Sequence, residues 1–66
     1  MYKRYYLSRT QYEGNKVVTC TEWTDYLPDA LGAASIYMGC RDIVAIVICD
    51  TTIEGPDYFI LKWSRD

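Results

Sequence analysis

The side chains that most often carry out catalysis or bind metals are few in this chain, and their spacing matches no known catalytic or metal-binding pattern. Histidine is absent, although it is the most common general base and metal ligand. The three cysteines, Cys20, Cys40 and Cys49, are widely spaced and form no C-x-x-C pair. A structural zinc site usually takes four Cys or His ligands, so we expect no metal. The pattern favours reduced thiols that serve as small hydrophobic side chains.

The carboxylates give no better indication of a reactive site. Asp50, Glu54 and Asp57 gather around one segment, but they lack the alternating ligand spacing of calcium loops and a proline interrupts them. We interpret this segment as a solvated turn. Cys40 has no histidine to activate its thiol, and the four glycines are too scattered to form a phosphate-binding loop. We therefore predict a non-enzymatic protein with no catalytic residues and no cofactor.

Aromatic side chains are the more informative group, with seven tyrosines and two tryptophans. Tyrosine offers a large contact area at low entropic cost, which favours a protein-protein interaction surface. If the first and last strands share an exposed face, their rings and cations would also suit stacked single-stranded bases or a nucleotide. The formal net charge of −2 and the missing signature of the sheet-based RNA-recognition fold argue against this alternative. The candidate interaction surface comprises Tyr2, Arg4, Tyr6, Arg9, Tyr12, Trp23, Tyr58, Ile60 and Lys62.

A tight turn positions the first group of these residues. Residues 2–12 have the composition of a strand, and Gly14-Asn15 between Glu13 and Lys16 is typical of a two-residue hairpin turn with glycine first. The strand register then follows by counting outward from the turn. This counting pairs Glu13 with Lys16, Tyr12 with Val17, Gln11 with Val18, Thr10 with Thr19, Arg9 with Cys20, Ser8 with Thr21, Leu7 with Glu22 and Tyr6 with Trp23.

The sequence leaves open which side of this hairpin is buried. Leu7 and Cys20 favour one side, whereas Trp23 favours the other. A bulge near Glu22 would reconcile the two.

A helix is predicted after the hairpin, from about Asp25 to Met38. Asp25 is placed to cap its first N–H groups, Pro28 suits the first turn, and Gly39 suits the residue after its end. Apolar residues recur at intervals of three and four and form one stripe, namely Leu27, Ala30, Leu31, Ala34, Tyr37 and Met38.

The segment Ile43–Cys49 is seven apolar residues long and is rich in β-branched side chains. It is too short to span a bilayer and is typical of a strand buried on both faces. A last strand follows at 58–63, with Phe59, Leu61 and Trp63 on one side and Tyr58, Ile60 and Lys62 on the other.

The predicted architecture is a single α+β domain over residues 1–66. Its order is ββαββ, with a four-stranded, mainly antiparallel sheet and one helix packed on one face. Strand order 2-1-3-4 satisfies the short hairpins, and order 1-2-3-4 with a parallel central pair is the competitor.

The layout resembles that of small, uncharacterised accessory proteins of bacteriophages and mobile elements, which share a charged first hairpin, a short helix and a Val/Ile-rich strand. The resemblance implies a modulator or inhibitor of a host protein and transfers no site residues. Met1 is followed by Tyr2-Lys3-Arg4, with no apolar signal segment and no membrane span, so we expect a cytoplasmic location.

Self-association is a further expectation. A helix of about fourteen residues is only about 21 Å long and covers one face of the sheet. The central strand is apolar on both faces, and a chain of 66 residues buries little core. We therefore predict a homodimer, with Ile60 and one face of Ile43–Cys49 near its interface.

Overall fold

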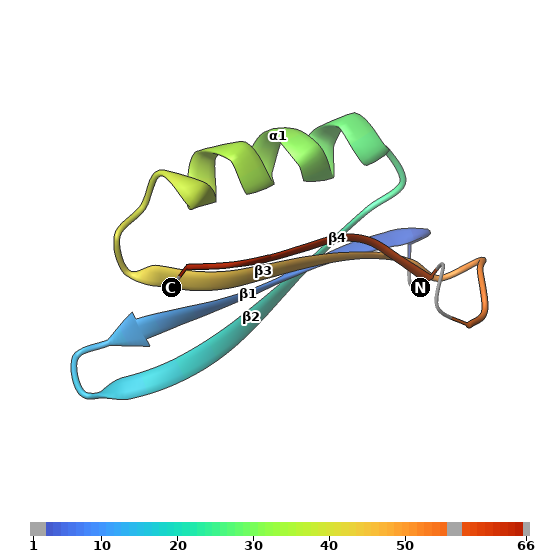
Figure 1. The fold of residues 1–66 in the computed structure, drawn as a ribbon. Coiled ribbons are helices and arrows are strands. Elements are labelled where there is room, and N and C mark those ends of the chain that lie inside the picture. The colour runs from blue at the N-terminus through green and yellow to red at the C-terminus, as the bar shows by residue number, and fades with distance from the viewer. Residues whose placement is uncertain (1–2, 56–57, 66) are drawn as a thin grey trace.

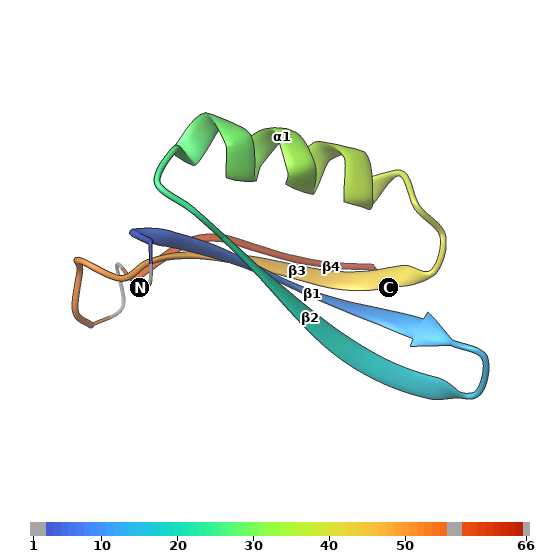
Figure 2. The same cartoon turned by 180° about the vertical axis from the view of Figure 1, so that it is seen from behind.

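The chain folds into a four-stranded sheet with one helix across one of its faces (Figures 1 and 2). The structure, a computed structural model, describes residues 3–55 and 58–65. The elements are β1 (Tyr5–Glu13), β2 (Lys16–Thr24), α1 (Leu27–Met38), β3 (Ile43–Asp50) and β4 (Phe59–Ser64). All neighbouring strands are antiparallel, in the order β2-β1-β3-β4. The predicted ββαββ fold and its preferred strand order are confirmed, and the parallel alternative is excluded.

The first hairpin has the predicted register throughout. Gly14 has a φ of +63°, which an L-residue rarely adopts, and it allows the two-residue turn that sets Glu13 opposite Lys16. Nine consecutive pairs follow without a shift, so the bulge considered near Glu22 is absent from this hairpin. The turn end of the hairpin bends away from β3, to the side of the sheet opposite α1 (Figures 1 and 2).

Two irregularities lie elsewhere in the sheet and decide which side chains share a face. The β1–β3 register shifts between Thr10 and Gln11, and the β3–β4 register shifts between Ile48 and Cys49. At the second shift Ile60 is the extra residue, because Ile48 pairs with Leu61 while Cys49 pairs with Phe59. Leu61 therefore packs on the core, whereas Phe59 pairs with a residue of the opposite face. The expectation that Phe59 shares a side with Leu61 was wrong, because simple alternation does not survive the bulge.

The core lies between α1 and the face of the sheet beneath it. Six residues with at most 5% exposure form it, namely Leu7, Ala30, Ala34, Ile43, Ile46 and Ile48. Ala30 and Ala34 are small, so the helix axis can approach the isoleucines of β3 closely. Leu31, placed by its spacing on the apolar stripe, is instead 43% exposed. The buried part of the helix is therefore narrower than its apolar stripe, because α1 rests on the sheet with no second helix beside it among the described residues.

The helix begins two residues later than predicted, at Leu27, with Pro28 in its first turn. Its N-cap residue makes no side-chain capping bond, so the assignment of Asp25 as the cap was wrong. Asp25 instead accepts a hydrogen bond from the backbone N–H of Arg4 at 3.1 Å. Gly39 ends the helix in a right-handed conformation with a φ of −82°, which places no special demand on glycine.

An ion pair between a half-exposed arginine and a buried carboxylate joins Arg4, just before β1, to the end of β3. Asp50 is 3% exposed and accepts hydrogen bonds from Arg4 Nε at 3.2 Å and Arg4 Nη2 at 3.0 Å. It also accepts bonds from the backbone N–H and the hydroxyl of Thr52 at 2.9 and 2.7 Å. These contacts, with Arg4 first, hold the pKa of Asp50 well below its ordinary value. Asp50 therefore does not belong to a solvated turn as predicted, and Asp57 lies outside the described residues.

Candidate functional site: the open face of the sheet

The face of the sheet opposite α1 is covered by no other element in the described part of the chain (Figures 1 and 2). We call it the open face. The register assigns to it alternate residues of each strand, namely Tyr6, Ser8, Thr10, Tyr12, Val17, Thr19, Thr21, Trp23, Ala45, Val47, Cys49, Phe59, Lys62 and Ser64.

Aromatic rings gather at one end of the open face and cross all four strands. The Tyr6 ring lies 5.1 Å from that of Trp23 and 6.0 Å from that of Tyr58, and the Tyr58 ring lies 5.4 Å from that of Phe59. We call these four residues the aromatic cluster. Cys49 of β3 lies within it and is fully buried, with 0% exposure. Tilted and edge-on rings at these separations attract one another beyond the area that they bury. The cluster is therefore an ordered surface.

Polar contacts hold the centre of the aromatic cluster. The Tyr58 hydroxyl donates a hydrogen bond to the Tyr6 hydroxyl at 2.8 Å, across the intervening strand β3. Hydrogen bonding to the Cys49 thiol, and then to Tyr58, raises the pKa of Tyr6 above its ordinary value. Tyr6 therefore stays neutral at physiological pH and acts as a fixed hydrogen-bonding centre. It does not supply a negative charge.

The aromatic cluster remains accessible from solvent. Trp23 is 36% exposed and Phe59 is 42% exposed. The ammonium group of Lys62 lies 4.0 Å from the centre of the Phe59 ring, where the ring face attracts a cation. Among the strand residues assigned to this face, Lys62 is the only charged one. The face therefore offers rings and hydroxyl groups with very little charge.

The predicted surface residues divide between the two faces. Tyr6, Trp23, Tyr58 and Lys62 come together at the aromatic cluster, as described above. Tyr12 lies on the same face near the hairpin turn, where it is 50% exposed. Ile60 is 38% exposed at the bulge of β4.

The two arginines of the predicted surface are engaged in structural contacts. Arg4 binds Asp50, as described above. Arg9 lies on the helix side of the sheet, where its guanidinium group contacts Glu22 and lies 4.6 Å from the centre of the Tyr37 ring. The tyrosines of the aromatic cluster and Arg9 therefore do not share a face, because the side chains of Tyr6 and Arg9 point to opposite sides of β1. Tyr2 lies outside the described residues.

Sequence reasoning missed two parts of this site. Phe59 was expected on the same side as Leu61 and Trp63, because the bulge that separates it from them leaves no signal in the sequence. Cys49 was read only as one residue of an apolar run, and its place beneath Tyr6 depends on the long-range β1–β3 pairing.

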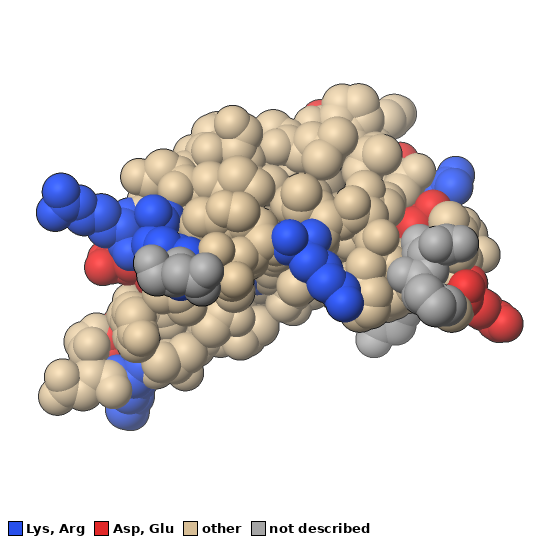
Figure 3. Space-filling model, viewed as in Figure 1, with Lys and Arg blue, Asp and Glu red and all other residues tan. Residues whose placement is uncertain are grey.

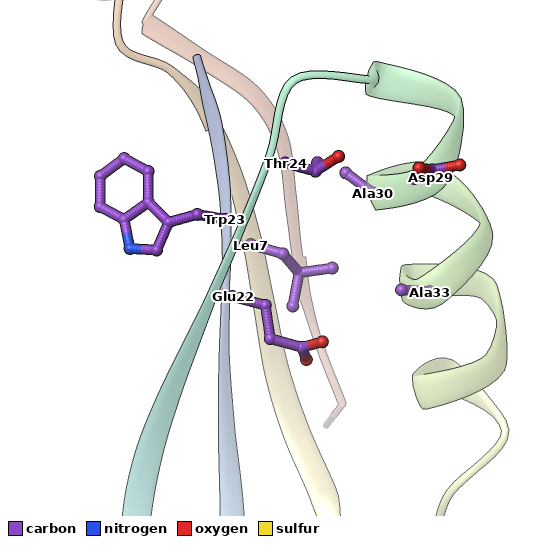
Figure 4. A pocket seen from close by; sticks show the side chains of 7 residues that line it. All are labelled: Leu7, Glu22, Trp23, Thr24, Asp29, Ala30 and Ala33. Carbon is purple, nitrogen blue, oxygen red and sulfur yellow. The ribbon is translucent and has the colours of Figure 1, made fainter. Parts of the chain in front are cut away.

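A hollow lies on the other side of the sheet, between α1 and β2, with a volume of about 240 Å³ (Figure 4). Leu7 forms its floor, Ala30 and Ala33 line its helix side, and Glu22 points into it, whereas the Trp23 side chain points away (Figure 4). The Tyr37 hydroxyl donates a 2.5 Å hydrogen bond to Glu22, which raises the pKa of Tyr37. The carboxylate that faces this hollow is therefore already occupied by protein partners.

Charged side chains gather toward the two ends of the molecule, with a broad uncharged surface between them that a single Lys or Arg side chain crosses (Figure 3). Within residues 3–55 and 58–65, no three Cys, Asp or Glu side chains converge as a metal site would require. The described part of the chain contains no helix long and apolar enough to cross a membrane.

Comparison of the chain with family models, with curated proteins and with solved structures finds no match in any of the three.

Proposed function

We propose that this protein is a non-enzymatic protein-interaction module that binds its partner through the open face. The aromatic cluster carries this proposal, because four rings lie side by side on a face that no other element of residues 3–55 and 58–65 covers. Fixed aromatic side chains with hydroxyl groups at their centre are the composition of binding hot spots. A partner would bury Trp23 and Phe59 without ordering them anew, so little entropy is lost on binding.

The charge of the open face favours a protein over a nucleic acid. Binding to phosphates depends on several Lys or Arg side chains that release counterions. The open face carries Lys62, while Arg9 is turned to the opposite side and bound to Glu22. The rings alone would stack bases, so a nucleic acid or nucleotide stays the alternative.

The resemblance to accessory proteins of bacteriophages and mobile elements supports a host protein as the partner, and modulation or inhibition of that protein as the outcome. The three free cysteines support a reducing compartment such as the cytoplasm.

The proposed use of the open face also restricts where the homodimer predicted from the sequence can form. A second copy seated on the open face would cover Val47 and the aromatic cluster, and it would exclude a different partner. A homodimer that leaves the proposed function intact must therefore use another surface.

Affinity capture from the native cell tests the proposed surface with three forms of the tagged protein. The wild-type protein and an Ile36→Ser control should recover the same protein partner, because Ile36 is 71% exposed on the outer side of α1. A Phe59→Ser variant should lose that partner while keeping its circular dichroism spectrum. Equal recovery by all three forms would contradict the proposal. Recovery of nucleic acid that falls steeply with added salt would support the alternative.

A further inference from the structure

Strand β2 is a long edge strand whose central residues, between Lys16 and Glu22, lack the usual features that prevent further pairing. It has nine residues, pairs with β1 alone and contains neither a bulge nor a proline. Between Lys16 and Glu22 it carries no charge, and four of its five residues there are β-branched. A strand of this kind is a ready template for a further strand.

The opposite edge of the sheet is protected. Strand β4 has only six residues, and its pairing with β3 is interrupted by the bulge at Ile60. It also carries Lys62. Bulges, short length and lysine are the devices with which edge strands avoid pairing, so the two edges of this sheet differ in what they can accept.

The backbone of β2 directs hydrogen-bonding groups outward at alternate residues. The N–H of Tyr12 donates to the carbonyl of Asp42 at 2.9 Å, so Tyr12 directs its backbone toward β3 and away from β2. Its partner Val17 must then direct its own N–H and C=O to the outside, and Thr19 and Thr21 follow by alternation. Within the described residues, the backbones of these three have no strand to pair with beyond β2.

The sequence of β2 matches itself in one antiparallel register. With Thr19 on the two-fold axis, Thr19 faces its own copy and Val17 faces Thr21, so all the outward backbone groups meet in hydrogen-bonded pairs. The same register sets Lys16 opposite Glu22, so a cation would lie near a carboxylate that Arg9 and Tyr37 of its own chain also contact, at both ends of the pairing. We propose that β2 pairs with β2 of a second copy of this chain in this register, which joins two sheets into one of eight strands.

The position of α1 leaves room for the second copy. The helix packs on core residues of β1 and β3, and the half-open hollow beside Leu7 separates it from β2. Pairing about an axis perpendicular to the sheet places both helices on the same side, each set back from the seam. The two open faces then lie together on the other side. The dimer would therefore present two aromatic clusters on one surface, and it would not compete with the partner proposed above.

Mass in solution is the first test. Light scattering should give twice the 7.7 kDa of the chain for the wild-type protein. A Thr19→Pro variant should give the single-chain mass, because proline removes the outward N–H at the two-fold axis without breaking a bond to β1. The matched control Thr19→Val loses the same side-chain contact with Thr10 but keeps the N–H, so it should remain a dimer. A single-chain mass for the wild-type protein at every concentration, or a dimeric Thr19→Pro variant that is folded by circular dichroism, would overturn the proposal.

A disulfide tests the register independently. In the proposed pairing Val18 faces Cys20 of the second copy in a non-hydrogen-bonded pair, where Cα atoms lie about 4.5 Å apart and within disulfide reach. A Val18→Cys variant in a Cys40→Ser background should therefore form a covalent dimer under mild oxidation. Cys20 and its own copy are diagonal neighbours about 7–8 Å apart, so the background protein alone should not cross-link. The double variant Val18→Cys, Cys20→Ser should also stay uncross-linked.

The outcomes separate this proposal from the proposed function. A dimer that survives Thr19→Pro and gives no Val18→Cys cross-link would place the interface elsewhere and overturn the β2 pairing. Loss of the partner in the Phe59→Ser variant concerns the open face alone and should leave the mass of the dimer unchanged.

Discussion

Two neighbouring residues of β3 provide a sharp test of which face of the sheet is the core. Ile46 is fully buried under α1, with 0% exposure, whereas Val47 points to the open face and is only partly buried. Replacing each with alanine in turn removes apolar atoms from opposite sides of the same strand. The two losses of stability should differ severalfold.

The magnitudes follow from the buried carbon atoms. Ile46→Ala removes three buried carbons, worth about 0.8 kcal/mol each, and the cavity that remains brings the loss to about 3–4 kcal/mol. Val47→Ala removes two carbons that are only partly buried, on the face that α1 does not cover, so the loss should be about 1 kcal/mol. A domain of this size has a free energy of unfolding of about 3–10 kcal/mol. Ile46→Ala therefore removes a large part of the total stability, and Val47→Ala removes little.

Urea unfolding followed by circular dichroism measures both losses at a protein concentration low enough to keep the chain monomeric. The slope of the free energy against urea should stay constant, which shows that both variants lose stability and keep the same fold. If Ile46→Ala does not fold, Ile46→Val should still cost about 0.5–1.5 kcal/mol. Equal losses at Ile46 and Val47, or a larger loss at Val47, would refute the face assignment on which the open face depends.

Three further predictions concern glycine, acid and alkali. Gly14→Ala should lower the free energy of unfolding by about 1–2 kcal/mol, because Gly14 has a φ of +63°. Gly32→Ala should raise it by about 0.5–1 kcal/mol, because a helical glycine with open space beside it accepts a methyl group. Urea unfolding measures both changes. The pKa of Asp50 is lowered in the folded state, so its contribution to stability should be complete above about pH 4 and be lost as the pH falls further. An Asp50→Asn variant should be less stable at neutral pH and lose less on acidification, and an unchanged acid profile would contradict this. The pKa values of Tyr6 and Tyr37 are both raised, so in an ultraviolet titration two tyrosines should ionise after the exposed ones. Cys49→Ala should shift the Tyr6 step to lower pH and leave the Tyr37 step in place.

The first hairpin could be predicted because its register is a local property. Once Gly14 fixes a two-residue turn, every pair from Glu13 and Lys16 outward follows by counting. The strand order could also be predicted, since short connections and one strongly apolar strand leave few arrangements. The buried side of the hairpin could not, because both of its faces carry large apolar side chains.

Long-range contacts account for the expectations that were wrong. The role of Asp25 depends on Arg4, which is twenty-one residues away, and the burial of Asp50 depends on the same arginine forty-six residues away. The neighbouring residues alone place such carboxylates at a helix cap or in a solvated turn, because these are frequent positions for aspartate. The bulge at Ile60 likewise exists only in the pairing of β4 with β3, and it places Phe59 on the open face, opposite to Leu61.

The three cysteines differ in their burial, so the rates at which their thiols react report on motions of the fold. Cys40 is exposed, Cys20 is partly buried, and Cys49 is sealed beneath the aromatic cluster. Reaction of Cys49 with a thiol reagent requires the sheet or its aromatic cover to open, so the labelling rate under native conditions counts those openings. A ligand held on the open face would slow the labelling of Cys49 and leave that of Cys40 unchanged. The protein thus carries its own reporter of occupancy, which can be read before any partner has been identified.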